Sequence, residues 1–180
     1  MTTLVKEALR GKQSAYQRLY HLHKQNLFLV CLRYAKNRET AEDYLQEAFI
    51  NIFKNLDQFN QLKGAFESWA KRITINVCLA DIRKNSLYLV NISGAEHLAT
   101  FDEGVLSKLS LKEMLETIQE LPYGYKTIFN MYVIDGFSHK EISAELGISI
   151  STSKTQLMKA RNMLKKKIEA SQQIFLEHHG

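Results

Sequence analysis

Proline and glycine are scarce in this sequence. Its 180 residues include one Pro and eight Gly, so few positions favour tight turns. A fold made of many short strands would need more of both residues. Aromatic and branched residues recur at spacings of three and four rather than in alternation, which is the helical period. These features predict an all-α protein.

Cysteine, metal-ligand clusters and long apolar runs are also scarce. Cys31 and Cys78 lie in apolar helical patterns with no CxxC or Cys/His cluster, and the six His are scattered. Buried free thiols in a reducing cytosol are therefore expected, with no metal and no cofactor. No apolar run approaches the length of a membrane span, and no signal-peptide pattern opens the sequence. We expect a cytoplasmic protein without direct membrane insertion.

Charge is unevenly distributed along the chain. The formal net charge is +5, a basic balance that suits a polyanionic partner. Residues 1–88 carry a net charge of +6, residues 89–108 a net −2 and residues 109–180 a net +1. The middle segment also lacks helical periodicity. We therefore predict two small helical domains, 1–88 and 109–180, joined by a flexible linker at 89–108.

The segment that begins at Ser138 has the pattern of two helices joined by a tight turn. Ser138 can cap the first helix, and Glu141 can complete a capping box. Gly147 follows that helix, where it can adopt the left-handed conformation at no steric cost. Ser149 or Ser151 can cap the second helix. The pattern is that of a helix-turn-helix whose recognition helix comes second.

The second helix of this pair has an apolar side and a polar side. Its buried stripe is predicted to contain Leu157, Ala160, Leu164 and Ile168. The opposite side is predicted to present donors that can read base edges and neutralise phosphates, namely Ser153, Lys154, Gln156 and Lys159. Between Lys154 and Lys167 there are six basic residues and no acid. Such a run can be an ordinary solvated face, but joined to a capped helix-turn-helix it favours DNA contact.

Two further helices are predicted before this pair, which would make a four-helix domain. The first begins near residue 109 and ends before Pro122, which can occupy the first turn of the next helix. That next helix is expected from Tyr123 to Asp135, before Gly136. Its predicted core residues are Ile128, Met131, Tyr132 and Val133.

The N-terminal half is predicted to contain helices at 2–11 and from about 14 to 37, followed by a third that starts at a capping-box-like pair, Thr40 and Asp43. The third helix is predicted to bury Ala41, Leu45, Ala48, Ile52 and Leu56. Its outer side carries Asp43, Gln46, Glu47 and Lys54, with Phe49 and Ile50 at the margin. That side is either a solvated face, which periodicity alone favours, or a docking surface for another protein.

Polar residues between 57 and 65 predict a loop, and another helix follows it. This helix is predicted to turn inward Phe66, Trp69, Ile73, Val77 and Ala80. The exterior of the loop and helix is basic, with Lys63, Lys71, Arg72, Arg83 and Lys84. Cations, loop amides and exposed aromatic rings suit single-stranded DNA. A tryptophan in such a pattern is nevertheless more often part of a core.

Three segments resemble a known family. In chain order they are AEDYLQEAFINIFKNLDQF, SWAKRITINVCLADIRKN and ELPYGYKTIFNMYVIDGFSHKEISAELGISISTSKTQLMKAR. They resemble the extracytoplasmic-function (ECF) group of the sigma-70 family, the bacterial RNA polymerase sigma factors. The resemblance covers most of residues 10–168. It implies a factor that directs core RNA polymerase to specific promoters and initiates transcription.

The resemblance also implies roles for individual residues. Contact with core polymerase would fall to Asp43, Gln46, Glu47 and Phe49. The minus-ten promoter element would be recognised and unstacked, with a base captured by the 59–65 loop, through Phe59, Asn60, Gln61, Lys63, Arg72, Asn76, Arg83 and Lys84. The minus-thirty-five element would be read by Thr152, Ser153, Lys154, Gln156, Lys159 and Arg161. An anti-sigma factor is the usual further partner of this family.

Two alternatives compete with this interpretation. A stand-alone helix-turn-helix regulator would leave the 43–49 face and the 57–84 segment without a role. An all-α enzyme would need a nucleophile, a base and an orienting group, and the sequence shows no such set. We therefore expect no enzymatic activity and no small-molecule substrate.

Overall fold

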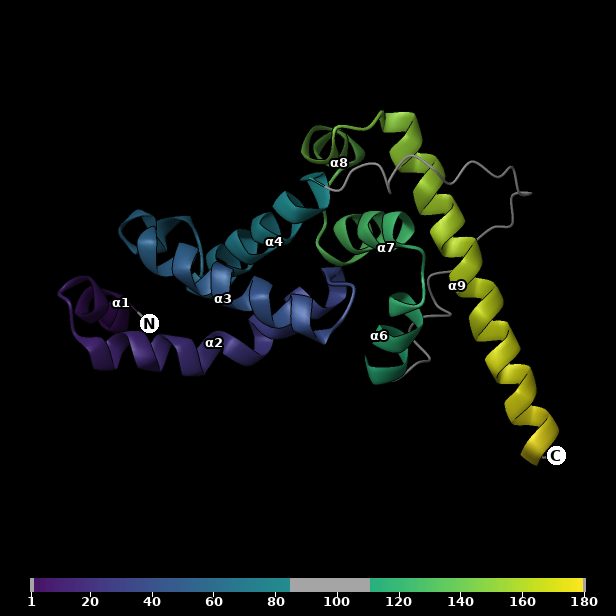
Figure 1. Ribbon diagram of the computed structural model, residues 1–180, viewed down its shortest axis with the longest axis horizontal. Helices are drawn as coiled ribbons and strands as arrows, with labels where there is room; N and C mark the ends of the chain where they lie inside the picture. Colours follow the sequence, from purple (N-terminus) through teal and green to yellow (C-terminus); the bar gives the residue numbers. More distant parts are fainter. Residues whose placement is uncertain (1, 85–110, 180) are drawn as a thin grey trace. The chain divides into compact units, whose positions relative to one another are not determined.

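The computed structural model describes residues 2–84 and 111–179. In these residues the chain is helical and has no strand, and it divides into two compact units, Met1–Ile82 and Arg83–Gly180 (Figure 1). The prediction of an all-α fold with two helical domains is confirmed. The predicted linker at 89–108 lies outside the described residues.

The first unit is built around a long helix. Its elements are α1 (Thr2–Leu9), α2 (Gln13–Tyr34), α3 (Arg38–Lys54), the short 3₁₀ turns η1 (Leu56–Gln58) and η2 (Gln61–Lys63), and α4 (Phe66–Lys84). Helix α2 packs against both α1 and α3, as its broad apolar content predicts. The shared core includes Leu4, Ala8, Leu19, Leu27, Ile52, Phe66 and Ala70.

Helix α3 starts one turn earlier than its predicted cap. The N-cap residue is Asn37, whose side-chain oxygen accepts a 2.9 Å hydrogen bond from the backbone N–H of Thr40. The prediction that Thr40 and Asp43 form the capping pair is therefore wrong. Asn is as good an N-cap as Thr, and here it stands at the position where the preceding chain is extended.

The buried face of α4 is centred differently from the predicted stripe. Ala70, Cys78 and Ile82 are fully buried. Trp69 and Ile73, which were predicted to point inward, are only partly buried, and so is Ala80. The centre of the packed face instead follows Ala70, Thr74, Cys78 and Ile82, each four residues after the last, so the predicted stripe is displaced around the helix by about one residue.

The two cysteines lie within the core of the first unit. Cys31 on α2 and Cys78 on α4 are free and fully buried, as predicted. A hydrogen bond with Cys31, together with burial, raises the pKa of the Cys78 thiol well above its ordinary value. Cys78 therefore stays protonated at neutral pH, which makes it a poor nucleophile.

The second unit is a four-helix domain. It contains α6 (Leu111–Gln119), α7 (Tyr123–Phe129) continued by a π-helical turn η4 (Asn130–Ile134), α8 (His139–Leu146) and α9 (Ile150–His179). Helix α9 packs against α6, α7 and α8. The predicted stripe on α9 is confirmed, because these residues are all buried: Leu157, Ala160, Leu164 and Ile168.

The helix predicted from Tyr123 to Asp135 changes its winding partway. Pro122 is the N-cap of α7 rather than part of its first turn. Beyond it, Asp135 N–H donates to the carbonyl of Asn130 at 2.9 Å, the wider spacing of a π-helix. The wider turn shifts the following side chains around the axis. Met131 is therefore buried but Tyr132 is exposed, and the prediction that Tyr132 faces the core is wrong.

Across residues 2–84 and 111–179, no helix combines the length and apolar character needed to cross a membrane. In the same residues, no three His, Cys, Asp or Glu side chains gather as metal ligands do.

Candidate functional sites

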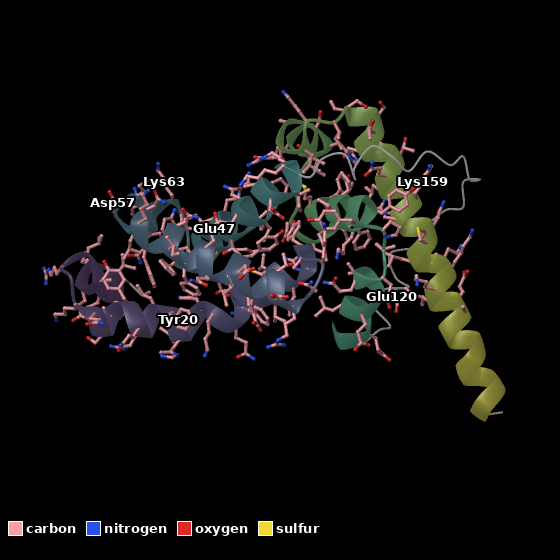
Figure 2. All side chains as sticks on the ribbon, viewed as in Figure 1. Tyr20, Glu47, Asp57, Lys63, Glu120 and Lys159 are labelled. Carbon is pink, nitrogen blue, oxygen red and sulfur yellow. The ribbon has the colours of Figure 1, made fainter. Side chains whose placement is uncertain are left out.

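The outer side of α3 presents a polar, mainly acidic surface. Asp43, Gln46 and Glu47 are exposed there (Glu47 is labelled in Figure 2). Two fully buried residues, Ala41 and Ala48, hold the opposite side of the helix in the core. The three polar residues are thus placed as the sequence predicts. We call them the α3 acidic face.

Phe49 does not belong to that face. It is 5% exposed, and its ring centroid lies 4.6 Å from that of Tyr20 and 5.6 Å from that of Phe53. The expectation that Phe49 is available to a partner is wrong, because aromatic residues of α2 and α3 enclose it. The exposed apolar residue is its neighbour Ile50, at 58% exposure, which sequence reasoning did not select. Ile50 follows Gln46 and Glu47 by about one helical turn.

The loop between α3 and α4 is held by aromatic packing. The Phe59 ring is partly buried and contacts the rings of Phe66 and Trp69, at centroid distances of 5.3 and 5.5 Å. Asn60 Oδ1 accepts a 2.9 Å hydrogen bond from the backbone N–H of Leu62. Gly64 has φ 149°, a conformation that a residue with a Cβ rarely adopts. The loop is therefore a fixed structure with Phe59 as its anchor.

The tip of this loop is exposed. The predicted contact residues Asn60, Gln61 and Lys63 all lie in solvent (Lys63 is labelled in Figure 2). Leu62 between them is 96% exposed, and sequence reasoning did not select it. On α4 the predicted residues Arg72 and Asn76 are exposed, as are Arg83 and Lys84.

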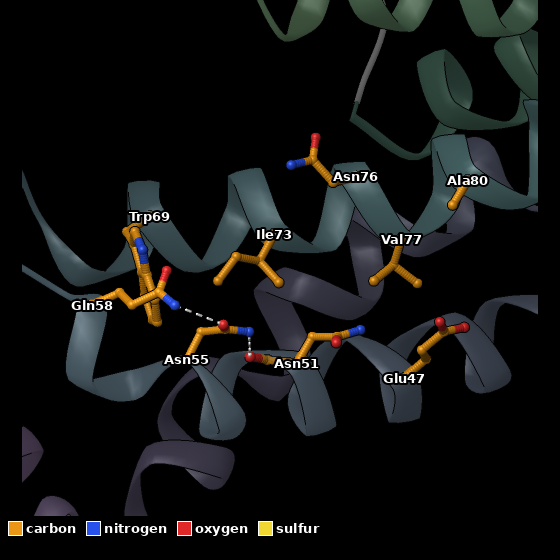
Figure 3. Close-up of a pocket in the computed structure, with 9 residues that line it drawn as sticks. All are labelled: Glu47, Asn51, Asn55, Gln58, Trp69, Ile73, Asn76, Val77 and Ala80. Atoms are coloured by element: carbon orange, nitrogen blue, oxygen red, sulfur yellow. Dashed lines mark hydrogen bonds between the residues drawn. The ribbon is translucent and has the colours of Figure 1, made fainter. Parts of the chain in front are cut away.

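A pocket of about 400 Å³ lies beside the loop, between α3 and α4 (Figure 3). One wall consists of Trp69, Ile73, Asn76, Val77 and Ala80 from α4. The other consists of Glu47, Asn51 and Asn55 from α3, with Gln58 at one end. The apolar edge of α4 therefore faces a row of polar side chains. The family resemblance implies that the 59–65 loop captures a base, and this pocket lies next to that loop.

Hydrogen bonds fix the polar wall of the pocket. Gln58 Nε2 donates to Asn55 Oδ1 at 3.0 Å, and Asn55 Nδ2 donates to the Asn51 carbonyl at 2.8 Å (Figure 3). The bonds orient the side-chain amides of Gln58 and Asn55, which can both donate and accept, whereas Asn51 takes part through its backbone carbonyl. Sequence reasoning missed Asn51, Asn55 and Gln58. The available signal for the first two was their spacing of four residues from Glu47 and from each other, which aligns them along one side of α3.

The helix-turn-helix of the second unit has the predicted caps. Ser138 and Glu141 form a reciprocal capping box, and Gly147 ends α8 with φ 66°. Ser149 caps α9 by accepting a 2.9 Å hydrogen bond from the backbone N–H of Thr152. Across the turn, the Ser143 hydroxyl donates to the Ile148 carbonyl at 2.6 Å. These bonds set the angle at which α9 leaves α8.

Two residues predicted on the exposed side of α9 are buried. Ser153 is 0% exposed and Gln156 is 7% exposed. The prediction that they face outward is wrong, because α9 packs against α7 and α8 and these two residues lie in the buried part of that helix. A small hydroxyl is tolerated there since Ser153 Oγ lies 2.9 Å from His139 Nδ1, a hydrogen-bond distance.

The outward side of α9 still carries cations. Lys154 is exposed, while Thr152, Lys159 and Arg161 are partly exposed (Lys159 is labelled in Figure 2). Ser151 and Thr155, one turn apart, are also exposed and were not selected from the sequence. The exposed residues of the first turns thus include Ile150, two small hydroxyl residues and Lys154. The hydroxyls and the Lys154 amine can contact phosphates and base edges.

Comparison with known proteins agrees with this geometry. The family described as Sigma-70 region 2 matches residues 19–88, and the family described as Sigma-70, region 4 matches residues 111–164. The ECF RNA polymerase sigma factor SigW of Bacillus subtilis (strain 168) is 33% identical over 178 residues, which cover 91% of this chain and 94% of SigW. The ECF RNA polymerase sigma-E factor of Escherichia coli (strain K12) is 26% identical over 181 residues, covering 92% and 93% of the two chains.

A solved structure shows the same fold. The sigma factor RpoE from Bartonella quintana, in complex with the anti-sigma factor NepR, matches with a TM-score of 0.50 at 21% identity, over 86% of this chain and 96% of that one. Two helical units of these kinds, in this order, define a sigma factor of RNA polymerase. The chain belongs to the sigma-70 family, in its extracytoplasmic-function group.

Proposed function

We propose that this chain binds bacterial core RNA polymerase, directs it to specific promoters and opens the DNA there. The observation that carries the proposal is the pocket between α3 and α4, beside a loop that aromatic rings hold in place. Such a pocket can hold a base that has left the stack, which a protein that opens DNA requires. The helix-turn-helix in the same chain supplies a second, independent DNA-binding element.

The α3 acidic face is the proposed docking surface for polymerase. Asp43, Gln46 and Glu47 would supply its polar contacts, and Ile50 would supply the apolar contact first assigned to Phe49. An exposed apolar side chain flanked by charges is the ordinary composition of a protein interface. Phe49 then has a structural role, since it packs behind this surface.

The loop and pocket are the proposed site for the minus-ten element. Single-stranded bases can stack on Trp69, and one unstacked base can enter the pocket against Asn51, Asn55 and Gln58. Unstacking a base costs a few kcal/mol, which capture in a pre-organised pocket offsets. Strand and backbone contacts would come from Asn60, Gln61, Lys63, Arg72, Asn76, Arg83 and Lys84. Phe59 would act by anchoring the loop.

Helix α9 is the proposed reader of the minus-thirty-five element. Lys154, Lys159 and Arg161 would neutralise phosphates, and Ser151, Thr152 and Thr155 would reach base edges or sugars. Ser153 and Gln156 would hold α9 in place from the interior. Recognition would thus use the outward side of the first three turns of α9.

These sites suggest a separate role for each segment of the chain. Residues 1–88 would dock on polymerase and open the minus-ten element, residues 109–180 would read the minus-thirty-five element, and 89–108 would connect them. Such a protein works by binding and catalyses no reaction itself. It would act in the cytoplasm, where the polymerase and the chromosome are. RpoE was solved with its anti-sigma factor NepR, and we propose that a protein of that class also controls this chain.

Holoenzyme assembly separates this function from the alternative of a stand-alone regulator. The purified chain would be mixed with bacterial core polymerase and the mixture separated by size. Co-elution at a one-to-one ratio is the expected result. A chain that does not bind core polymerase but binds a palindromic duplex as a dimer would be the stand-alone regulator instead.

A further inference from the structure

His139 lies at the junction of three elements in the second unit. It is the first residue of α8, and its ring stacks on Tyr132 of η4, with the centroids 4.4 Å apart and the planes 23° from parallel. Its Nδ1 lies 2.9 Å from Ser153 Oγ on α9. The ring is only partly buried, so these contacts fix its orientation without enclosing it.

The surroundings of His139 are cationic. Burial, then Lys154 and then Arg161 lower the pKa of its ring below the ordinary value. Both cations belong to α9, and the Arg161 guanidinium carbon lies 6.0 Å from the centroid of the Tyr132 ring. The neighbouring charged residues on α8 are Lys140 and Glu141, and Glu141 is engaged in the capping box with Ser138. The adjacent acid Glu141 is thus engaged, while Lys154 and Arg161 of α9 oppose a positive charge on the ring.

We propose that protonated His139 binds a DNA phosphate together with Lys154, so that duplex binding by the second unit takes up a proton. The inference rests on the proposed function of α9 as a DNA reader. It adds His139 to the residues of the second unit that contact DNA.

The chemistry of the ring suits this role. Ser153 Oγ can either donate to Nδ1 or accept from it, so that bond survives protonation with Ser153 as acceptor. Nε2–H then remains as a donor for a phosphate oxygen. Without DNA, burial and then the nearby cations lower the pKa of the ring and so favour its neutral form. A phosphate offsets their repulsion and favours the imidazolium, and the proton comes from solvent. The Tyr132 face also stabilises a cationic ring better than a neutral one.

The test measures binding of the full chain to a labelled duplex, selected by that chain from a randomised pool, between about pH 8 and about pH 5.5. Wild-type affinity should rise as pH falls, by about tenfold for each unit by which DNA raises the His139 pKa. His139→Gln should flatten this profile. Lys154→Ala should weaken binding across the whole pH range. His21→Gln, which changes an exposed histidine on α2, is the matched control and should behave as wild type.

Each other outcome overturns the proposal. A pH-independent wild-type affinity, or an equal loss at every pH in His139→Gln, would leave His139 with a structural role only. Absence of duplex binding by the wild type would overturn the proposed function of α9 as well. If His139→Gln does not fold, proton NMR of the wild-type chain decides, with the His139 ring assigned through its contact with Tyr132. Its pKa should rise when the duplex is added, and an unchanged pKa would refute the proposal.

Discussion

The Tyr44 hydroxyl donates a 2.7 Å hydrogen bond to Asp81 Oδ2, which joins the start of α3 to the end of α4. Tyr44 is buried and directly follows Asp43 of the α3 acidic face. Asp81 is one residue beyond Ala80, which lines the pocket. This hydrogen bond thus joins α3, which carries the proposed docking surface, to α4, which forms the apolar wall of the pocket.

Removing this hydroxyl should destabilise the first unit. Tyr44→Phe leaves the Asp81 carboxylate without this donor, and a hydrogen bond to a charged group contributes about 1.5–3 kcal/mol. Urea unfolding followed by the fluorescence of Trp69, the single tryptophan of the chain, reports on this unit. Tyr20→Phe, on the exposed side of α2, is the control and should shift the midpoint little. Equal stabilities of wild type and Tyr44→Phe would show that the bond contributes nothing.

Reversing charge on the α3 acidic face should impair polymerase binding. The double variant Asp43→Lys with Glu47→Lys should bind core polymerase at least about tenfold more weakly, because complementary charges become like charges. Circular dichroism should be unchanged, since both side chains are exposed. Reversal at two exposed acids of the second unit, Glu116 and Glu169, provides a matched change in net charge. Normal holoenzyme assembly by the α3 variant would remove these residues from the docking surface.

Filling the pocket should block DNA opening and spare docking. Ile73→Trp would occupy space that an unstacked base needs, so open-complex formation should fall by about tenfold or more. Fluorescence of 2-aminopurine placed in the minus-ten element measures that step. Leu22→Trp, at an exposed position on α2, is the control. If both variants open the promoter as wild type does, the pocket holds no base.

The stability of the first unit should fall as the solution becomes mildly acidic. His23 is buried, its ring centroid lies 4.9 Å from that of Phe66, and burial lowers its pKa despite the opposing effect of Glu67. The unfolded chain therefore binds the proton more readily than the folded chain. The contribution of neutral His23 to the free energy of unfolding is fully present above the unfolded pKa of about 6.5. It is lost as pH falls through the lower pKa of the folded state.

Urea midpoints at about pH 7.5 and about pH 5.5, read from Trp69 fluorescence, measure this effect. His23→Leu should reduce the difference between the two midpoints, whereas His21→Gln, at an exposed position, should retain it. If the difference between the two urea midpoints persists in full in His23→Leu, groups other than His23 cause the pH dependence of stability.

The sequence predicted the helices well because their signals are local. The capping box at Ser138, the glycine at 147 and the stripe on α9 each depend on residues within one or two turns. The same local rules failed where two signals competed. Asn37 and Thr40 are both good N-caps, and only the direction of the incoming chain decides that Asn37 is used.

The site residues were harder to predict because exposure depends on neighbours from distant parts of the chain. Phe49 and Ile50 both lie at the edge of the apolar stripe of α3, and the rings of Tyr20 and Phe53 bury the first and leave the second exposed. Ser153 looks like a base-reading residue until His139 is seen to cover it. The pocket needs Asn55 and Trp69 from two helices, a pairing that no single helical pattern reveals.

Run-off transcription with core polymerase on fragmented genomic DNA tests the central claim most directly. Core polymerase alone should start at few defined sites, whereas core polymerase with this chain should start at a set of promoters that share two sequence elements. Alignment of those start sites would give both elements at once. Transcripts that are identical with and without the chain would contradict its role as a promoter-directing sigma factor.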